Sequence, residues 1–241
     1  MRKSVTEQRW NLHYNDIVLS TNPIAYWPLD EKVGTVAWDW VSGRVASAQN
    51  GAHVGVTLGE PGIGDGMTCP YYDGTNDYTN VLTAPFAAAF NGSEGSLMIW
   101  WKQHASAFND AVIRRAVMLY VDAQNHVILN KTGTNANWQM NYRAGNVLES
   151  SNLLLAATRT EWSCSVMTWS FTGDAVRYYD AGLNYETDTV LGVWAGALPS
   201  AIIGATNTTP TGSYYGWLAH CAVWNRALSA GECDMLYKAR Y

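Results

Sequence analysis

Apolar and polar residues alternate along much of this chain with the period of two that is typical of a β-strand with one buried face. The alternation is strictest from Trp138 to Arg143. Similar short runs follow one another, separated by turns rich in Gly, Asn and Asp. Further strands are expected at 96–102, 117–121, 127–129, 165–171, 175–179, 201–204 and 217–224. This series predicts an all-β protein, an antiparallel β-sandwich of the jelly-roll type.

Two of the expected turns are specific enough to predict hairpins. Asp122–Asn125 and Gly173–Asp174 each separate two apolar runs and contain the residues that tight turns favour. In the strand at 165–171, Met167, Trp169 and Phe171 share one face.

One α-helix is predicted near the C-terminus. Ser229 and Glu232 have the spacing of a capping box, in which each side chain bonds the backbone N–H of the other residue. Met235, Leu236 and Ala239 then share a helical face. We expect this short helix to pack across the edge of a sheet.

The first 22 residues differ from the rest of the chain. Residues 1–22 are polar, and we interpret them as an N-terminal arm or short helix in which Tyr14–Leu19 packs on the body. Residues 23–241 are predicted to form a single domain. The polar start lacks the apolar region of a secretory signal, and the longest apolar run, 116–121, is too short to span a membrane.

Composition narrows the possible partners. The chain has 15 Lys and Arg against 20 Asp and Glu, so it lacks the basic surplus that nucleic-acid binding requires. Its 12 Trp and 14 Tyr against 4 Phe suit half-buried sheet faces, protein interfaces and sugar platforms. The four cysteines show no zinc-ligand spacing, and we expect them to be reduced thiols.

Several segments, in their order and spacing, resemble the laminin G-like group of the concanavalin A-like lectin/glucanase superfamily. They are Pro23–Glu31, Gly34–Gly43, Tyr72–Tyr78, Trp169–Asp174 and Ala222–Ser229. The resemblance covers nearly the whole chain and implies a concanavalin A-like jelly roll. Similar domains are frequent in tailed-bacteriophage virion proteins, where they follow a short N-terminal segment.

Catalytic residues are not expected. The glucanase branch of the superfamily uses paired glutamates on one strand with an Asp between them, and this sequence has no such strand. Asp30 and Glu31 are adjacent and would point to opposite faces, and Glu186 and Asp188 are expected in a solvated loop. His220, on a predicted buried strand, is interpreted as a hydrogen-bonded core residue.

Metal ions and cofactors are likewise not predicted, although calcium was weighed. Some members of the resembled group bind calcium near the position of Asp39, with an acidic pair where Ala219 and His220 stand here. Asp73 and Asp77 are alternative ligands, but an Asx turn also explains them.

Sugar binding would require an aromatic ring at the rim, close to groups that bond hydroxyls. Trp40, Trp138 and Tyr185 lie near predicted loops with Asn and Asp neighbours, so they are the candidate ligand-binding residues. A core or interface position remains the alternative for each of them.

The leading functional hypothesis is a non-catalytic structural or interaction protein of a tailed-bacteriophage virion, of the capsid decoration or head-fibre type. Residues 1–22 would bind other virion proteins in an oligomeric assembly, and deleting them is expected to abolish incorporation without unfolding the domain. The alternative is a carbohydrate-binding adhesion module that binds a cell-surface glycan. A divergent glycosidase is the third possibility.

Overall fold

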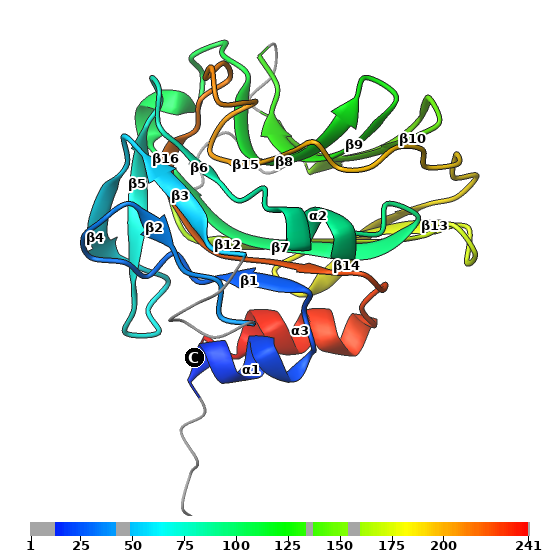
Figure 1. Ribbon diagram of the computed structural model, residues 1–241, viewed down its shortest axis with the longest axis horizontal. Helices are drawn as coiled ribbons and strands as arrows, with labels where there is room; N and C mark the ends of the chain where they lie inside the picture. The colour runs from blue at the N-terminus through cyan, green and yellow to red at the C-terminus, as the bar shows by residue number, and fades with distance from the viewer. Residues whose placement is uncertain (1–12, 42–48, 134–136, 154–159, 241) are drawn as a thin grey trace, which may run out of the picture.

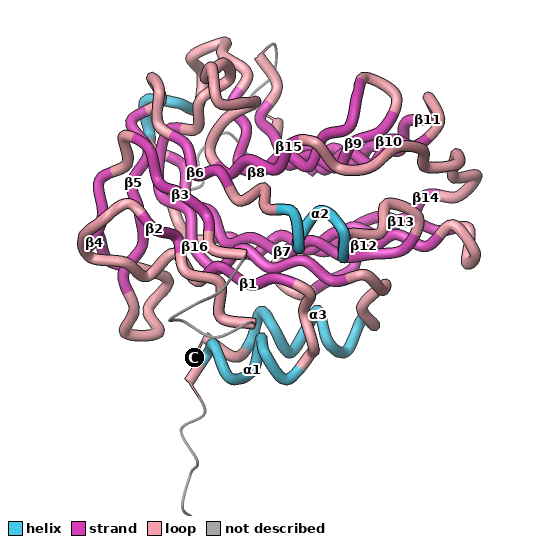
Figure 2. Tube along the Cα trace, in the orientation of Figure 1, coloured by secondary structure: helices cyan, strands magenta, loops and turns pink. Residues whose placement is uncertain are grey.

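A computed structural model describes residues 13–41, 49–133, 137–153 and 160–240. In this part of the chain, two antiparallel sheets stack face to face as a β-sandwich (Figures 1 and 2). The predicted fold class, a jelly-roll sandwich with a short C-terminal helix, is confirmed.

The first sheet runs in the order β14-β13-β12-β7-β16-β5-β4, with β1 paired to β16. Its long central strands, β7 and β16, pair with each other in antiparallel register. The strands are β1 (Ala25–Trp27), β4 (Thr57–Pro61), β5 (Thr68–Asp73), β7 (Glu94–Gln103), β12 (Ser163–Ser170), β13 (Ala175–Asp180), β14 (Leu183–Asp188) and β16 (Tyr215–Trp224). Glu186 and Asp188 therefore lie in an edge strand and not in the loop that we expected.

The second sheet runs in the order β11-β10-β9-β8-β15-β6-β3-β2. Both predicted hairpins are present, β8–β9 in this sheet and β12–β13 in the first. The strands are β2 (Val36–Ala37), β3 (Gly51–Val54), β6 (Tyr78–Asn80), β8 (Arg114–Asp122), β9 (Asn125–Lys131), β10 (Trp138–Ala144), β11 (Val147–Leu153) and β15 (Ser200–Ile203).

Aromatic rings fill the space between the two sheets. Trp101 of the first sheet stacks on Trp138 of the second, with ring centroids 4.3 Å apart, and Trp169 stacks on Tyr142 in the same way. Phe171, predicted on the same strand face as Trp169, is 42% exposed. The reason is that β12 ends at Ser170, and the carbonyl of Phe171 accepts the backbone N–H of Asp174 in the turn.

Two helices cover the outer face of the first sheet, and a third lies at the opening between the sheets (Figure 1). They are α1 (Tyr14–Ser20), α3 (Ala230–Lys238) and α2 (Ala84–Ala89), and a single 3₁₀ turn, η1 (Ala105–Ala107), follows β7. The helix α3 contacts the edge strand β14, in keeping with the predicted packing across a sheet edge, and it also lies over the outer face of the sheet. The outer faces of β7, β12 and β16 carry apolar side chains, such as Trp100, Val166 and Trp224, and α3 buries them.

The capping box of α3 is confirmed. The backbone N–H of Glu232 donates to Ser229 Oγ (3.3 Å), and that of Ser229 donates to Glu232 Oε2 (2.8 Å). Cys233 and Leu236 are fully buried, whereas Met235 is 38% exposed and does not lie on the buried face as expected. Cys233 and Leu236 are three residues apart, so they lie on the same side of the helix, and this side faces the sheet.

The helix α1 is fastened to both α3 and the sheet. The Tyr14 hydroxyl donates to the carbonyl of Leu236 (2.9 Å) and accepts from Trp100 Nε1 (2.6 Å). Val18 is fully buried beside them. The expected packing of Tyr14–Leu19 on the body is thus observed. Residues 1–12 lie outside the described part of the chain. The domain boundary after residue 22 stays a prediction.

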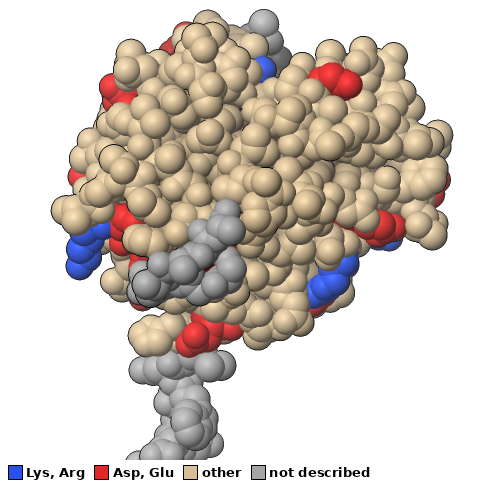
Figure 3. All heavy atoms as spheres, viewed as in Figure 1, with Lys and Arg blue, Asp and Glu red and all other residues tan. Residues whose placement is uncertain are grey.

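On the face shown in Figure 3, the described Lys, Arg, Asp and Glu side chains are scattered and form no large patch of one sign.

Cys69, Cys164, Cys221 and Cys233 are buried and unpaired with one another. Burial raises the pKa of the Cys69 thiol to about 12, so it stays protonated at neutral pH. Among the described helices, none is long and apolar enough to cross a membrane.

Candidate ligand-binding groove

The outer face of the second sheet is built from the residues of β8, β9 and β10 that alternate with the core. Leu119, Val127 and Met140 point into the sandwich, so their neighbours along each strand point away from it. Strand register aligns these outward residues in three rows. The rows are Tyr120–His126–Arg143, Met118–Ile128–Asn141 and Arg115–Asn130–Gln139.

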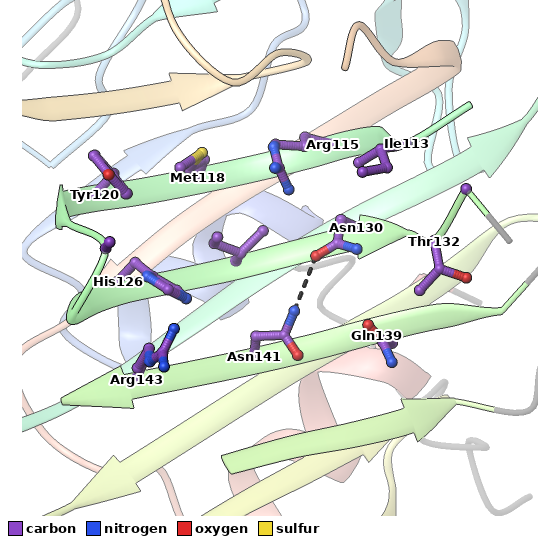
Figure 4. A pocket seen from close by; sticks show the side chains of 13 residues that line it. Ile113, Arg115, Met118, Tyr120, His126, Asn130, Thr132, Gln139, Asn141 and Arg143 are labelled. Atoms are coloured by element: carbon purple, nitrogen blue, oxygen red, sulfur yellow. Dashed lines mark hydrogen bonds between the residues drawn. The ribbon is translucent and has the colours of Figure 1, made fainter. Parts of the chain in front are cut away.

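These rows line an open groove of about 560 Å³, and Figure 4 shows their side chains rising from the three neighbouring strands. Ile113 and Thr132 line the end of the groove that lies nearest Arg115. A second hollow of about 350 Å³ shares Arg115, Met118 and Tyr120 and continues toward the residues that follow β15. The candidate site therefore extends across four strands of one sheet.

The groove has an apolar floor and polar walls. Met118 and Ile128 are 4% and 5% exposed because longer polar side chains stand around them. Asn141 Nδ2 donates to Asn130 Oδ1 over 3.0 Å (Figure 4). An amide side chain has two donors and one acceptor oxygen, so this single bond leaves Asn141 with a further donor and its oxygen for a ligand. Such a pairing of apolar surface with amide groups suits a polyhydroxylated molecule.

The charged groups of the groove are all basic. Arg115 Nε donates to Thr206 Oγ1 (2.8 Å), and Arg143 Nη2 donates to Asn146 Oδ1 (3.0 Å). Neither guanidinium forms an ion pair with a carboxylate of the described residues, and none of the described residues that line the groove is acidic. Burial lowers the pKa of Arg115 somewhat, but an arginine remains protonated at any physiological pH.

His126 lies between these charges, at the middle of its row. Burial lowers its pKa below the usual value, the contact of its Nδ1 with the carbonyl oxygen of Asp122 opposes the shift, and the charges of Arg143 and Arg115 add to it. The ring is therefore neutral at pH 7. It stacks on Tyr120 with centroids 6.1 Å apart, and the two rings form one wall of the groove.

The three aromatic residues that sequence reasoning singled out lie apart from one another and from this groove. Trp138 is 2% exposed and its Nε1 donates to Gln103 Oε1 (2.7 Å) inside the sandwich, which corrects its expected place near the rim. Trp40 is half-buried against the apolar cluster under α1 and α3. Tyr185 lies on the edge strand β14 and is 47% exposed, so of the three it presents the most ring surface.

The polar residues of β10 could have been assigned to one face from the sequence. The alternation that placed Trp138, Met140 and Tyr142 on one face also places Gln139, Asn141 and Arg143 together on the opposite face. The alternation of β10 alone cannot show that β8 and β9 add an apolar floor and a second arginine, because strand order is not encoded locally.

The aspartates that were candidate calcium ligands accept hydrogen bonds from backbone N–H groups. Asp39 Oδ1 accepts from the backbone N–H of Tyr26 (2.9 Å), and Asp77 Oδ2 accepts from that of Asp73 (2.8 Å). The described residues contain no group of three or more His, Cys, Asp or Glu side chains that could hold a metal ion. These aspartates fix loops in place.

Two buried histidines contact carboxylates without forming an accessible site. His53 lies between Glu31 (3.1 Å) and Thr79 (2.9 Å), but its side chain is enclosed in the core. His220 Nε2 lies 3.0 Å from Asp65 Oδ2, and its Nδ1 lies 2.7 Å from the hydroxyl of Tyr26. His220 is thus the hydrogen-bonded buried residue that we expected, and no substrate reaches either ring.

Comparison with known proteins found likeness at the level of structure. No protein-family model and no curated protein matches the sequence. Domain 4 of an extracellular arabinanase from Geobacillus stearothermophilus, solved with arabinotriose, matches with a TM-score of 0.65 at 14% identity over 89% of this chain and 98% of that domain. Both lengths are covered almost completely, so the two folds correspond as whole units.

Parts of larger proteins match as well. The botulinum neurotoxin serotype D binding domain matches with a TM-score of 0.65 at 12% identity, over 90% of this chain and 51% of that one. Trypanosoma rangeli sialidase, solved with the inhibitor DANA, matches with a TM-score of 0.59 at 11% identity, over 88% of this chain and 32% of the enzyme. The chain thus spans about half of the toxin domain and a third of the sialidase. Together these likenesses show that the protein has the fold of a jelly-roll β-sandwich.

Proposed function

We propose that this protein is a non-catalytic carbohydrate-binding module and that the groove on the outer face of the second sheet holds the glycan. The observation that carries the proposal is the pairing of two amide side chains, Asn130 and Asn141, with an apolar floor and a wall of stacked rings. Hydroxyl groups would bond the amides while the less polar faces of the sugar rest on Met118 and Ile128.

The comparisons support this proposal over the other readings. The arabinanase domain that matches this chain along its whole length was solved with arabinotriose. None of the described residues lining the groove is acidic, whereas glycoside hydrolysis needs two carboxylates beside the scissile bond. Binding without cleavage is therefore the function that these side chains suit.

The test is calorimetric titration with the oligosaccharides that a glycan array selects, followed by Asn141→Ala. Loss of a hydrogen bond to the ligand is expected to weaken binding about fivefold, since one net hydrogen bond contributes roughly 1 kcal/mol. Asn184→Ala on the edge strand β14 is the matched control, because Asn184 is exposed and lies on the other sheet. Absence of glycan binding, or equal affinities for the two variants, would contradict the proposal.

Attachment to a tailed-bacteriophage virion, oligomeric assembly and contacts of residues 1–22 with other virion proteins stay predictions from the sequence resemblance. A glycan-binding groove is compatible with a place on a particle surface, since adhesion to a host envelope uses such modules. Immunogold labelling of intact particles would test the virion prediction, which fails if the protein is absent from them.

A further inference from the structure

The basic groups of the groove stand at its opposite corners. Arg115 shares a row with Gln139, and Arg143 lies four residues further along the same strand, β10, as Gln139. With about 3.4 Å per residue along a strand and about 4.8 Å between strands, the backbones of the two arginines are roughly 16 Å apart. A ligand that contacts both must extend over several sugar units.

The surroundings of the two guanidinium groups differ from those of the neighbouring cations on β8 and β9. Arg114 on β8 and Lys131 on β9 both pair with Asp110 (2.6 and 2.8 Å), and Arg226 pairs with Glu232 (2.6 Å). Arg115 and Arg143 each bond one neutral oxygen instead. The groove therefore concentrates uncompensated positive charge on a protein whose formal net charge is −5.

We infer that the glycan bound in this groove is acidic, an extended oligosaccharide whose carboxylate groups are held by Arg115 at one end and Arg143 at the other. The inference rests on the proposed function and names the class of ligand for that site. A planar guanidinium matches a carboxylate with two parallel hydrogen bonds. An overall acidic protein repels polyanions at a distance, so its local basic groove selects an acidic sugar by contact and not by general attraction.

His126 offers a readout inside the groove that does not depend on affinity. The charged groups that act on it among the described residues are Arg143 and Arg115, with Asp122 at the adjoining turn, and the ring of Tyr120 lies against it. A carboxylate that enters the groove adds negative charge beside the imidazole, and this favours the protonated form. Binding of an acidic glycan is thus expected to raise the pKa of His126, whereas a neutral glycan leaves it unchanged or lowers it.

The experiment compares oligogalacturonate, its carboxyl-reduced neutral counterpart and a sulfated oligosaccharide of similar length in calorimetric titrations at low salt. Oligogalacturonate is expected to bind at least tenfold more tightly than the reduced form, because hydrogen bonds between charged groups are stronger than those between neutral groups. Arg115→Gln and Arg143→Gln should each remove most of this preference. Arg177→Gln, on strand β13 of the other sheet, is the charge-matched control and should retain it. NMR titration of His126, assigned with His126→Gln, supplies the second measurement.

The outcomes separate this inference from the proposed function. Equal affinity for the acidic and the reduced oligosaccharide, with no change in the pKa of His126, overturns the acidic class and leaves glycan binding standing. Binding of the sulfated probe alone also overturns the carboxylate assignment. If no carbohydrate binds at all, the proposed function fails and the inference fails with it. A preference that survives both arginine substitutions overturns the assignment to Arg115 and Arg143.

Discussion

Tryptophan and tyrosine side chains occupy two kinds of position in this molecule. Trp138 is enclosed between the sheets, where it stacks on Trp101 and bonds Gln103, whereas Tyr185 lies half in solvent on an edge strand. Both residue types combine a large apolar ring with a polar group, so composition alone does not separate the two positions. The two positions differ in how much of the protein covers the ring: Trp138 has a sheet on either side, whereas Tyr185 lies at the edge of one sheet.

A pair of substitutions measures this difference. Trp138→Ala is expected to lower the free energy of unfolding by about 3–5 kcal/mol, because it removes a buried ring and leaves a cavity. Tyr185→Ala is expected to change it by less than about 0.5 kcal/mol. Urea denaturation followed by circular dichroism gives both values. Comparable losses for the two variants would contradict the placement of Trp138 in the core.

At the level of elements, the start of the C-terminal helix is held both by hydrogen bonds between neighbouring residues and by a hydrogen bond to a distant part of the chain. Its capping box follows from residues 229–232 alone, but Arg226 adds two bonds to the Glu232 carboxylate and a third to the carbonyl of Thr21 (2.8 Å). The hydrogen bond from Arg226 lowers the pKa of Glu232 to about 2, from an ordinary value of 4.5. The cap thus ties α3 to the segment that follows α1.

Glu232→Gln should therefore destabilise the protein in a pH-dependent way. The folded-state pKa is depressed, so the charged carboxylate stabilises the fold above about pH 4.5, and this contribution is lost as the pH falls toward about 2. We expect a loss of about 1 kcal/mol at pH 7 that disappears at low pH. Asp234→Asn, which breaks an exposed pair with Lys238, should cost less than about 0.5 kcal/mol. Thermal unfolding of the variants between pH 2 and 7 checks the difference, and a loss that does not vary with pH would contradict it.

At the scale of the whole molecule, one sheet is covered by helices and the other presents its outer face. The outer face of the first sheet is apolar and is buried by α1 and α3, whereas that of the second sheet carries the groove. The amino-terminal helix is consequently part of the body. Its Tyr14 and Val18 are 3% and 0% exposed.

Two deletions distinguish a detachable arm from a structural helix. Removal of residues 1–12 keeps the contacts that α1 makes with the described residues, and we expect it to leave the unfolding midpoint unchanged. Removal of residues 1–22 uncovers Trp100 and Tyr26, and should lower stability by at least about 3 kcal/mol through the lost burial of two large apolar side chains. This outcome differs from the sequence-based expectation that the domain tolerates the longer deletion. Chemical denaturation and binding of an apolar dye report both effects, and equal stability of the two truncated proteins would refute the structural role of α1.

Local pattern was sufficient for the class of fold and for the longer strands, but not for the edge strand β14, where a loop was expected. The alternation at Trp138–Arg143, the turn residues at Asp122–Asn125 and the capping pair Ser229 and Glu232 each act within a few residues, so their outcome could be predicted from the chain alone. The ends of elements were less certain, as Phe171 shows, because the first residue of a turn can still match the strand pattern.

The candidate site was decided by tertiary structure. Arg115, Asn130 and Asn141 belong to three strands, and the register between β8, β9 and β10 brings them to one face. The face that α3 buries also depended on which sheet carried apolar residues on its outer side. The sequence alone determines which residues alternate between apolar and polar along each strand, and therefore that the strands form a two-layer sandwich. The reason is that this alternation is set by neighbouring residues in the chain. Which outward residues meet is decided only when distant strands pair, since pairing depends on the packing of the whole core.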